Sequence, residues 1–248
     1  MKAWNAQDPR ERALFLRSLA EEGIEEIYLE TLRLPVPVKQ AVQTVTEPMA
    51  DDAFSLKDEL LSLRTKAMQC TLCQELAGKR QHVVFGSGNM KAELMFVGEA
   101  PGADEDEQGL PFVGRAGQLL TKIIESIGLT RRQVFIANVL KCRPPQNRQP
   151  KPDEIQNCQP FLIRQIELIR PKVICALGTF AAQTLLKTDQ SIGRIRGQFK
   201  ELPLAHIPGV KVIATYHPAY LLRSPEGKKD VWEDMKKIKK ELEKPINA

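Results

Sequence analysis

Residues 93–97 read ELMFV, and they run directly into GEAPGADEDEQGLPFVGRAG at positions 98–117. The first five residues have the composition of a buried strand, and the apolar spacing in QLLTKIIESI at 118–127 indicates a helix. Two glycines and a proline therefore lie where a strand passes into a helix, which is where ligands bind in open α/β sheets. The acidic run Asp104–Glu107 would repel phosphate, the usual ligand at such a turn.

The alternation of strand and helix continues along the chain and predicts the fold. Four short apolar runs read as strands buried on both faces: Leu94–Val97, Val134–Asn138, Val173–Leu177 and Lys211–Thr215. Helical patterns follow them at Gln118–Ile127, Asp153–Ile169, Thr179–Leu186 and Lys228–Glu243. We therefore predict an α/β fold, a three-layer αβα arrangement with a central four-stranded parallel sheet, plus an N-terminal helical appendage.

The sequence before the first strand divides into two parts. Residues 1–32 are predicted to be a helical segment, because Asp8, Pro9 and Glu11 supply the start signals of a helix over 8–30. Residues 33–53 contain three prolines and no helical periodicity, which is typical of a linker. Residues 54–248 then form the main predicted domain.

Composition is ordinary for a globular protein, with 42% hydrophobic and 27% charged residues. No apolar run is long enough to span a membrane, and the N-terminus lacks the apolar core of a signal peptide. We therefore expect a cytoplasmic monomer without a membrane partner. The net charge of +5 favours a polyanionic partner without establishing one.

Five cysteines, an odd number in a chain expected to be cytosolic, argue against a disulfide framework. Cys175 lies in a predicted strand and is expected to be an inert core residue. Cys70, Cys73, Cys142 and Cys158 remain, enough for one closed tetrahedral metal site. Zinc and an iron–sulfur cluster both accept four thiolates, and the spacing alone does not choose between them.

Polar residues stand at the ends of three predicted strands. Glu99, Asn138 and His217 each follow an apolar run, and His217 begins the motif HPAYLLR. The carboxyl ends of parallel strands meet at one edge of a sheet, so these side chains are expected to converge on a pocket.

Four motifs carry a resemblance to a known family: GEAPG, LPFVGRAGQLL, FIANVLKCRPP and HPAYLLR. In this order, together with the four cysteines, they resemble the family 4 uracil-DNA glycosylases, which contain an iron–sulfur cluster. The resemblance covers residues 54–248 and implies a 4Fe–4S cluster on Cys70, Cys73, Cys142 and Cys158. It also implies monofunctional hydrolysis of the N-glycosidic bond of deoxyuridine in DNA, a step of base excision repair that leaves an abasic site.

The resemblance also implies a uracil-binding set of residues: Gly98, Ala100, Glu105, Phe112, Asn138 and His217. Phe112 would stack on the flipped pyrimidine, and the amide of Asn138 would donate to O4 and accept from N3–H. Glu99 and His217 are the predicted catalytic residues, and His217 would donate a hydrogen bond to O2 of the departing uracil anion. Glu105 would guard the C5 side, where thymine carries a methyl group. Ala100 occupies the position at which better-known uracil glycosylases carry a water-orienting aspartate.

Other residues are candidates for contact with DNA. Leu221 is the first expectation for a side chain that enters the vacated base stack, and Leu222 is the second. Arg223, Arg143 and Arg196 are expected to contact phosphates. The other acidic residues of the first motif, Asp104, Asp106 and Glu107, are expected to form a solvated loop.

Three alternatives remain at this stage. A related protein could trap uracil-DNA covalently, although the comparable basic loop GRIRGQFKELP has no histidine. A non-catalytic iron–sulfur DNA-binding protein would explain the charge and the cysteines, but it would give no role to Glu99, Phe112, Asn138 and His217. A purely redox protein is disfavoured because no second cofactor motif is present. The N-terminal helix could dock a replication or repair protein.

Overall fold

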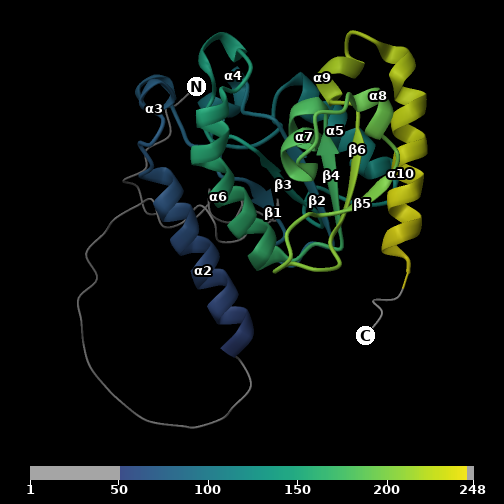
Figure 1. Ribbon diagram of the computed structural model, residues 1–248, viewed down its shortest axis with the longest axis horizontal. Coiled ribbons are helices and arrows are strands. Elements are labelled where there is room, and N and C mark those ends of the chain that lie inside the picture. Colours follow the sequence, from purple (N-terminus) through teal and green to yellow (C-terminus); the bar gives the residue numbers. More distant parts are fainter. Residues whose placement is uncertain (1–50, 245–248) are drawn as a thin grey trace, which may run out of the picture. The chain divides into compact units, whose positions relative to one another are not determined.

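The computed structural model describes residues 51–244, with side chains from residue 56 onward, and it is built around one six-stranded sheet (Figure 1). The strand order is β1-β3-β2-β4-β6-β5. The four inner strands, which run parallel, are β2 (Leu94–Gly98), β3 (Phe135–Asn138), β4 (Val173–Leu177) and β6 (Lys211–Thr215).

The predicted extent of the sheet was wrong, because two short strands extend its edges. β1 (Ser87–Gly88) pairs antiparallel with β3, and β5 (Phe199–Glu201) pairs antiparallel with β6. Both are short and none of their residues is fully buried, so neither produces the continuous apolar run by which the inner strands were predicted. The domain is therefore mixed α/β, with a parallel centre and antiparallel edges.

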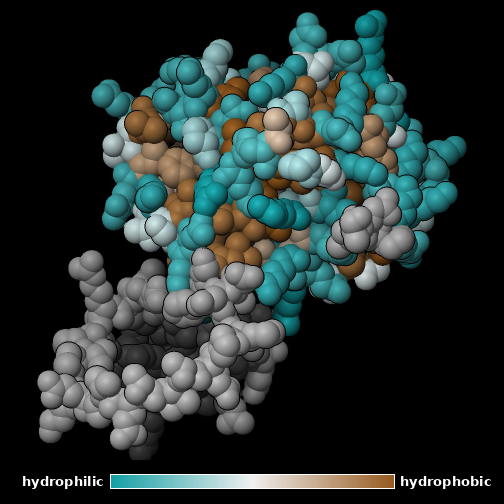
Figure 2. Space-filling model, turned by 60° about the horizontal axis from the view of Figure 1, so that its bottom comes forward, coloured by the Kyte–Doolittle hydropathy of each residue, from teal (hydrophilic) through white to brown (hydrophobic). Residues whose placement is uncertain are grey.

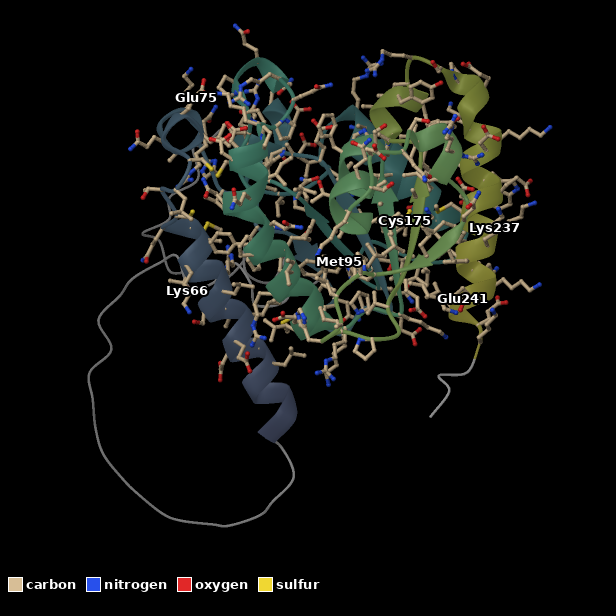
Figure 3. The ribbon with its side chains drawn as sticks, viewed as in Figure 1. Lys66, Glu75, Met95, Cys175, Lys237 and Glu241 are labelled. Carbon is tan, nitrogen blue, oxygen red and sulfur yellow. The ribbon has the colours of Figure 1, made fainter. Side chains whose placement is uncertain are left out.

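Helices cover both faces of the sheet, because alternate residues of each buried strand point to opposite sides. Met95 of β2 and Ile174 of β4 pack with one buried cluster that includes α6 (Pro152–Ile169) and α7 (Thr179–Leu186). Phe96 and Cys175 pack on the other face, against α5 (Arg115–Ser126), α9 (Pro218–Leu221) and α10 (Lys228–Leu242). Figure 3 labels Met95 and Cys175 among the strands between these layers.

A third apolar cluster lies beside the sheet, at the side occupied by α2 (Asp51–Met68) and α3 (Gln74–Lys79). Leu60 and Leu76 from these helices pack with Val83, Phe85 and Leu140. Helix α2 begins at Asp51, so the last three residues of the predicted linker 33–53 belong to this helix instead. The predicted helical segment 1–32 and the rest of the linker lie outside the described residues.

The remaining helical elements are short. They are α4 (Ala103–Gln108), the 3-10 turn η2 (Pro145–Asn147), α8 (Ile192–Ile195) and the 3-10 turn η3 (Pro225–Gly227). Among the described helices, none is both long and apolar enough to cross a membrane. The face shown in Figure 2 mixes hydrophilic and hydrophobic side chains over the described residues.

Candidate functional site

The carboxyl ends of β2 and β3 bring the first site residues together. Gly98 is paired with Asn138 in the register of these strands. A Cβ atom on Gly98 would lie 2.3 Å from Asn138 Oδ1 and 2.6 Å from the ring of Phe112. Only glycine at position 98 therefore leaves the amide of Asn138 and the ring of Phe112 facing the same small space.

The side chain of Asn138 is buried without a partner for its oxygen. The residue is 1% exposed, and Oδ1 accepts no hydrogen bond from the described residues. An unsatisfied buried acceptor costs about 1–3 kcal/mol, so its presence at a strand end is consistent with a group that a ligand satisfies. The main chain of the residue is fixed, because Lys141 Nζ donates to the Asn138 carbonyl at 2.9 Å.

His217 follows β6 and contacts the same space. Its ring lies 5.5 Å from that of Phe112, centroid to centroid. The Ala219 N–H donates to His217 Nδ1 at 3.1 Å, so the proton of the neutral imidazole must lie on Nε2. Burial, together with the charge of Arg223, lowers the pKa of His217 from 6.5 to about 4. The side chain is therefore a neutral hydrogen-bond donor near pH 7.

The loop that carries Phe112 is held by Glu105. The carboxylate of Glu105 accepts backbone N–H groups of Gly102 at 3.1 Å, Val113 at 2.9 Å and Gly114 at 3.0 Å. Glu105 is therefore a brace of the loop in this structure. Its expected place against C5 of uracil stays a prediction.

The acidic run forms helix α4 and not the loop that the sequence suggested. Asp104 and Glu107 are exposed, as expected, but Asp106 is only 2% exposed, so the expectation was wrong for this residue. The carboxylate of Asp106 accepts the backbone N–H groups of Gln81 and His82, at 3.0 Å and 3.3 Å. Asp106 is therefore buried because its carboxylate accepts these main-chain N–H groups, which belong to the segment that leads into the third apolar cluster.

Glu99 and Ala100 follow β2 at the same edge. Glu99 is half-buried, and its carboxylate meets no donor among the described residues; burial raises its pKa above the ordinary value. Ala100 is partly buried against the third apolar cluster. The structure therefore offers one carboxylate in this turn, at position 99.

Four of the five cysteines gather on one side of the domain. Cys70 follows α2, Cys73 caps α3, Cys142 follows β3 and Cys158 lies on α6. Each of Cys73, Cys142 and Cys158 has its pKa raised by burial, to about 11 for Cys158, and further by neighbouring cysteines of the set. Cys175 is fully buried in the sheet, as expected of a core residue. In Figure 3 it lies well away from Glu75, which belongs to α3.

Donors that the sequence did not reveal surround these sulfur atoms. Arg80 Nη1 lies 3.1 Å from Cys142 Sγ, the Lys141 N–H lies 3.2 Å from Cys158 Sγ, and Asn157 Nδ2 lies 3.7 Å from Cys73 Sγ. As the side chains lie, no three metal-binding residues within the described part of the chain are grouped around a single ion.

The candidate DNA contacts divide into exposed and buried residues. Leu221 is 1% exposed and packs in the core with α5 and α10, so the expectation of an exposed wedge at this position was wrong. Leu222 is 41% exposed, and Arg223 beside it is also exposed. The two residues of HPAYLLR differ because α9 turns Leu221 toward the sheet and Leu222 away from it.

The two remaining arginines also differ. Arg196 donates to the buried carboxylate of Asp234 at 2.9 Å and stacks on the ring of Tyr216, so it supports the fold instead of presenting a free charge. Its expected contact with a DNA phosphate stays a prediction. Arg143 donates to Asn147 Oδ1 at 2.9 Å and remains partly exposed.

A cavity of about 840 Å³ opens at the opposite edge of the sheet, where the strands begin. Its walls include Lys91, Arg170 and Lys211. Lys211 is engaged with Glu241 at 2.7 Å, and the site residues described above do not line this cavity. The candidate site residues therefore lie at the carboxyl edge of the sheet and not in this cavity.

The fold is α/β, and its carboxyl edge brings together an aromatic ring, an unsatisfied amide oxygen and a neutral imidazole, groups that can bind a planar, hydrogen-bonding ring. A family model for the uracil DNA glycosylase superfamily matches residues 85–236. The chain belongs to this superfamily.

Curated relatives agree with that assignment. The chain is 49% identical over 175 residues to a type-4 uracil-DNA glycosylase of Archaeoglobus fulgidus, covering 69% of this chain and 87% of that protein. It is 47% identical over 197 residues to one of Saccharolobus solfataricus, with 76% and 89% coverage. A third, from Thermotoga maritima, is 46% identical over 189 residues, with 75% and 95% coverage.

Proposed function

We propose that this chain is a monofunctional uracil-DNA glycosylase that holds flipped uracil at the carboxyl edge of its sheet and hydrolyses the N-glycosidic bond. The observation that carries the proposal is the buried, unsatisfied Oδ1 of Asn138, which faces the same space as Phe112 and His217. The names of the curated relatives support the same reaction.

Uracil is distinguished from cytosine by its hydrogen-bonding edge. Asn138 Oδ1 accepts N3–H of uracil, and the amide nitrogen donates to O4. Cytosine presents the opposite pattern at both positions and would leave the amide unsatisfied, at a cost of roughly 1–3 kcal/mol for each group. Phe112 supplies an aromatic face on which any flipped pyrimidine can stack.

Departure of uracil is the step that the chain assists. The electron pair of the C1′–N1 bond leaves with uracil, and the sugar passes through an oxocarbenium-like state. His217 Nε2–H donates to O2 of the uracil anion, and a preorganised donor of this kind contributes several kcal/mol where charge develops. Glu99 and the DNA phosphates face the sugar cation with negative charge. A water molecule then adds to C1′ and loses its proton to solvent, because Ala100 provides no carboxylate to orient it.

Cys70, Cys73, Cys142 and Cys158 would hold a 4Fe–4S cluster. Support comes from the donors beside three of the sulfur atoms, since thiolates bound to iron accept hydrogen bonds. When bound, the cluster supplies folding free energy by joining α3, the turn after β3 and α6. The four thiols have no open position to offer a substrate.

Contact with DNA is assigned to exposed residues near His217. Leu222 enters the stack left by the flipped base, and Arg223 contacts a phosphate. Arg143 adds a second phosphate contact. Leu221 supports this surface from the core.

The experiment is alkaline strand scission of a labelled oligonucleotide with one uracil, after incubation with the full-length protein in EDTA. Cleavage is expected at uracil and absent with thymine or cytosine at the same position. His217→Gln should abolish most of the cleavage at uracil, whereas Arg170→Gln, at the edge of the sheet where the strands begin, should leave it unchanged. Retained binding without cleavage would refute hydrolysis, and a protein–DNA adduct on a denaturing gel would identify covalent trapping.

A further inference from the structure

The ring of Phe112 is presented by an unusual main-chain conformation. Phe112 lies between α4 and α5 with φ +54°, in the left-handed region that residues with a side chain rarely adopt. Its carbonyl oxygen turns toward the start of α5, where a Cβ atom on Gly117 would lie only 1.8 Å away. A residue in this region persists only where its surroundings hold it there.

On one side, the restraint comes from Glu105. Its Oε1 atom accepts the N–H groups of Val113 and Gly114, the two residues that follow Phe112. These bonds fix the direction of the chain as it leaves the strained residue. The carbonyl groups of Pro111 and Phe112 accept no hydrogen bond from Glu105 and need another donor.

Arg131 satisfies both carbonyl groups from the opposite side. It lies in the loop between α5 and β3, and Nη2 donates to the Pro111 carbonyl at 2.8 Å. Nη1 donates to the Phe112 carbonyl at 3.1 Å and to Thr121 Oγ1 at 3.3 Å. The planar fork of arginine can bond two adjacent acceptors at once, which the single ammonium of lysine does less well.

We infer that Arg131 is a positioning residue, which with Glu105 clamps the main chain at Phe112 and so fixes the aromatic face against which uracil stacks. The charges of the pair also balance across the loop, because the Glu105 carboxylate opposes the effect of burial on the pKa of Arg131. The guanidinium is partly buried and both terminal nitrogens are engaged, so it is not a phosphate contact. This inference rests on the proposed uracil site.

The test compares Arg131→Gln and Arg131→Lys with Arg170→Gln. Arg170 is exposed at the opposite edge, and its side chain makes no ion pair or hydrogen bond within residues 51–244. Single-turnover uracil excision should fall by about 100-fold in Arg131→Gln, because small misplacements of a binding group have effects of that size. Arg131→Lys should recover part of the rate, and Arg170→Gln should match the wild type.

A double-mutant cycle with Phe112→Ala separates positioning from a general loss of structure. If Arg131 acts through Phe112, the double variant Phe112→Ala/Arg131→Gln should be no slower than Phe112→Ala alone. Fully additive losses, or a Phe112→Ala variant as fast as the wild type, would overturn the inference.

A second measurement does not depend on activity. Amide hydrogen exchange over residues 112–117 should become at least about tenfold faster in Arg131→Gln than in Arg170→Gln, while exchange in β4 stays unchanged. Unchanged exchange over 112–117 would overturn the clamp. A wild-type protein that releases no uracil would instead count against the proposed function, and the exchange data would still decide whether Arg131 holds the loop.

Discussion

Titration of His217 is the most direct check on the electrostatics of the site. Burial and the charge of Arg223 lower its pKa from 6.5 to about 4. A change of that size corresponds to about 3 kcal/mol against protonation in the folded protein. The imidazole should therefore stay neutral across the pH range in which an ordinary histidine gains its charge.

The sign of the effect on stability follows. Because the unfolded chain binds this proton more readily, lowering the pH from 6.5 toward 4 favours unfolding and removes up to about 3 kcal/mol from the free energy of unfolding. Above pH 6.5 the contribution is fully present. Excision should likewise show no transition near pH 6.5 attributable to His217.

Nuclear magnetic resonance of the imidazole groups measures this directly, since the chain has only three histidines. The His217 signals are those missing from His217→Gln, and their midpoint should lie well below pH 6. The nitrogen shifts should report a proton on Nε2, because Nδ1 accepts the Ala219 N–H. A midpoint at or above 6.5, or a proton on Nδ1, would refute the neutral-donor mechanism.

Three further outcomes are expected. Asn138→Ala should slow uracil excision about ten- to hundredfold, measured by single turnover, and a loss below threefold would exclude its role in reading the base. Leu222→Ala should weaken binding to uracil-containing duplex and leave the melting temperature of the protein unchanged. Leu221→Ala should instead lower the free energy of unfolding by about 2–5 kcal/mol, measured by denaturant titration. The reverse pattern would assign to Leu221 the side chain that enters the base stack. Cys142→Ala should give colourless or insoluble protein by iron assay and absorbance, and a soluble, fully active, iron-free variant would contradict the structural role of the cluster.

The inner strands could be predicted from the sequence because burial on both faces leaves an uninterrupted apolar run. Predicted Leu94–Val97 differs from β2 by one residue, and predicted Lys211–Thr215 coincides with β6. The edge strands β1 and β5 are half-exposed and only two and three residues long, so they leave no such signal.

The candidate site could be predicted where a single polar residue stands at the end of a predicted strand. Asn138 and His217 were recognised in this way, and the structure brings both to the ring of Phe112. Asp106 was misread because its burial depends on main-chain donors at positions 81 and 82, which are distant in sequence. Leu221 was misread because a four-residue helix is too short for periodicity to show which leucine faces the core.

The least predictable residues are those that hold others in place. Arg131 and Arg80 bond to backbone or sulfur atoms far from them in sequence, and the residues around an arginine carry no local signal for such a role. Lys141 is the clearest example. Its Nζ donates to the main-chain carbonyl of Asn138, and its own N–H donates to Cys158 Sγ, so one residue connects the cysteine set to the main chain of the proposed uracil-binding Asn138.

This connection suggests a physical role for the proposed 4Fe–4S cluster. Between Asn138 and Cys142 the main chain is bonded to α6 through Lys141, whose Nζ donates to Gln165 Oε1 and to the Asn138 carbonyl and whose N–H donates to Cys158 Sγ. A cluster that fixed the thiols would therefore also fix the backbone of Asn138, whose side-chain oxygen is buried without a hydrogen-bond partner. An unsatisfied acceptor survives folding only in a frame that cannot relax to cover it. In the proposed mechanism, the cluster on the cysteine side and the clamp at Phe112 would serve one purpose, which is to keep the uracil site in place in the absence of uracil.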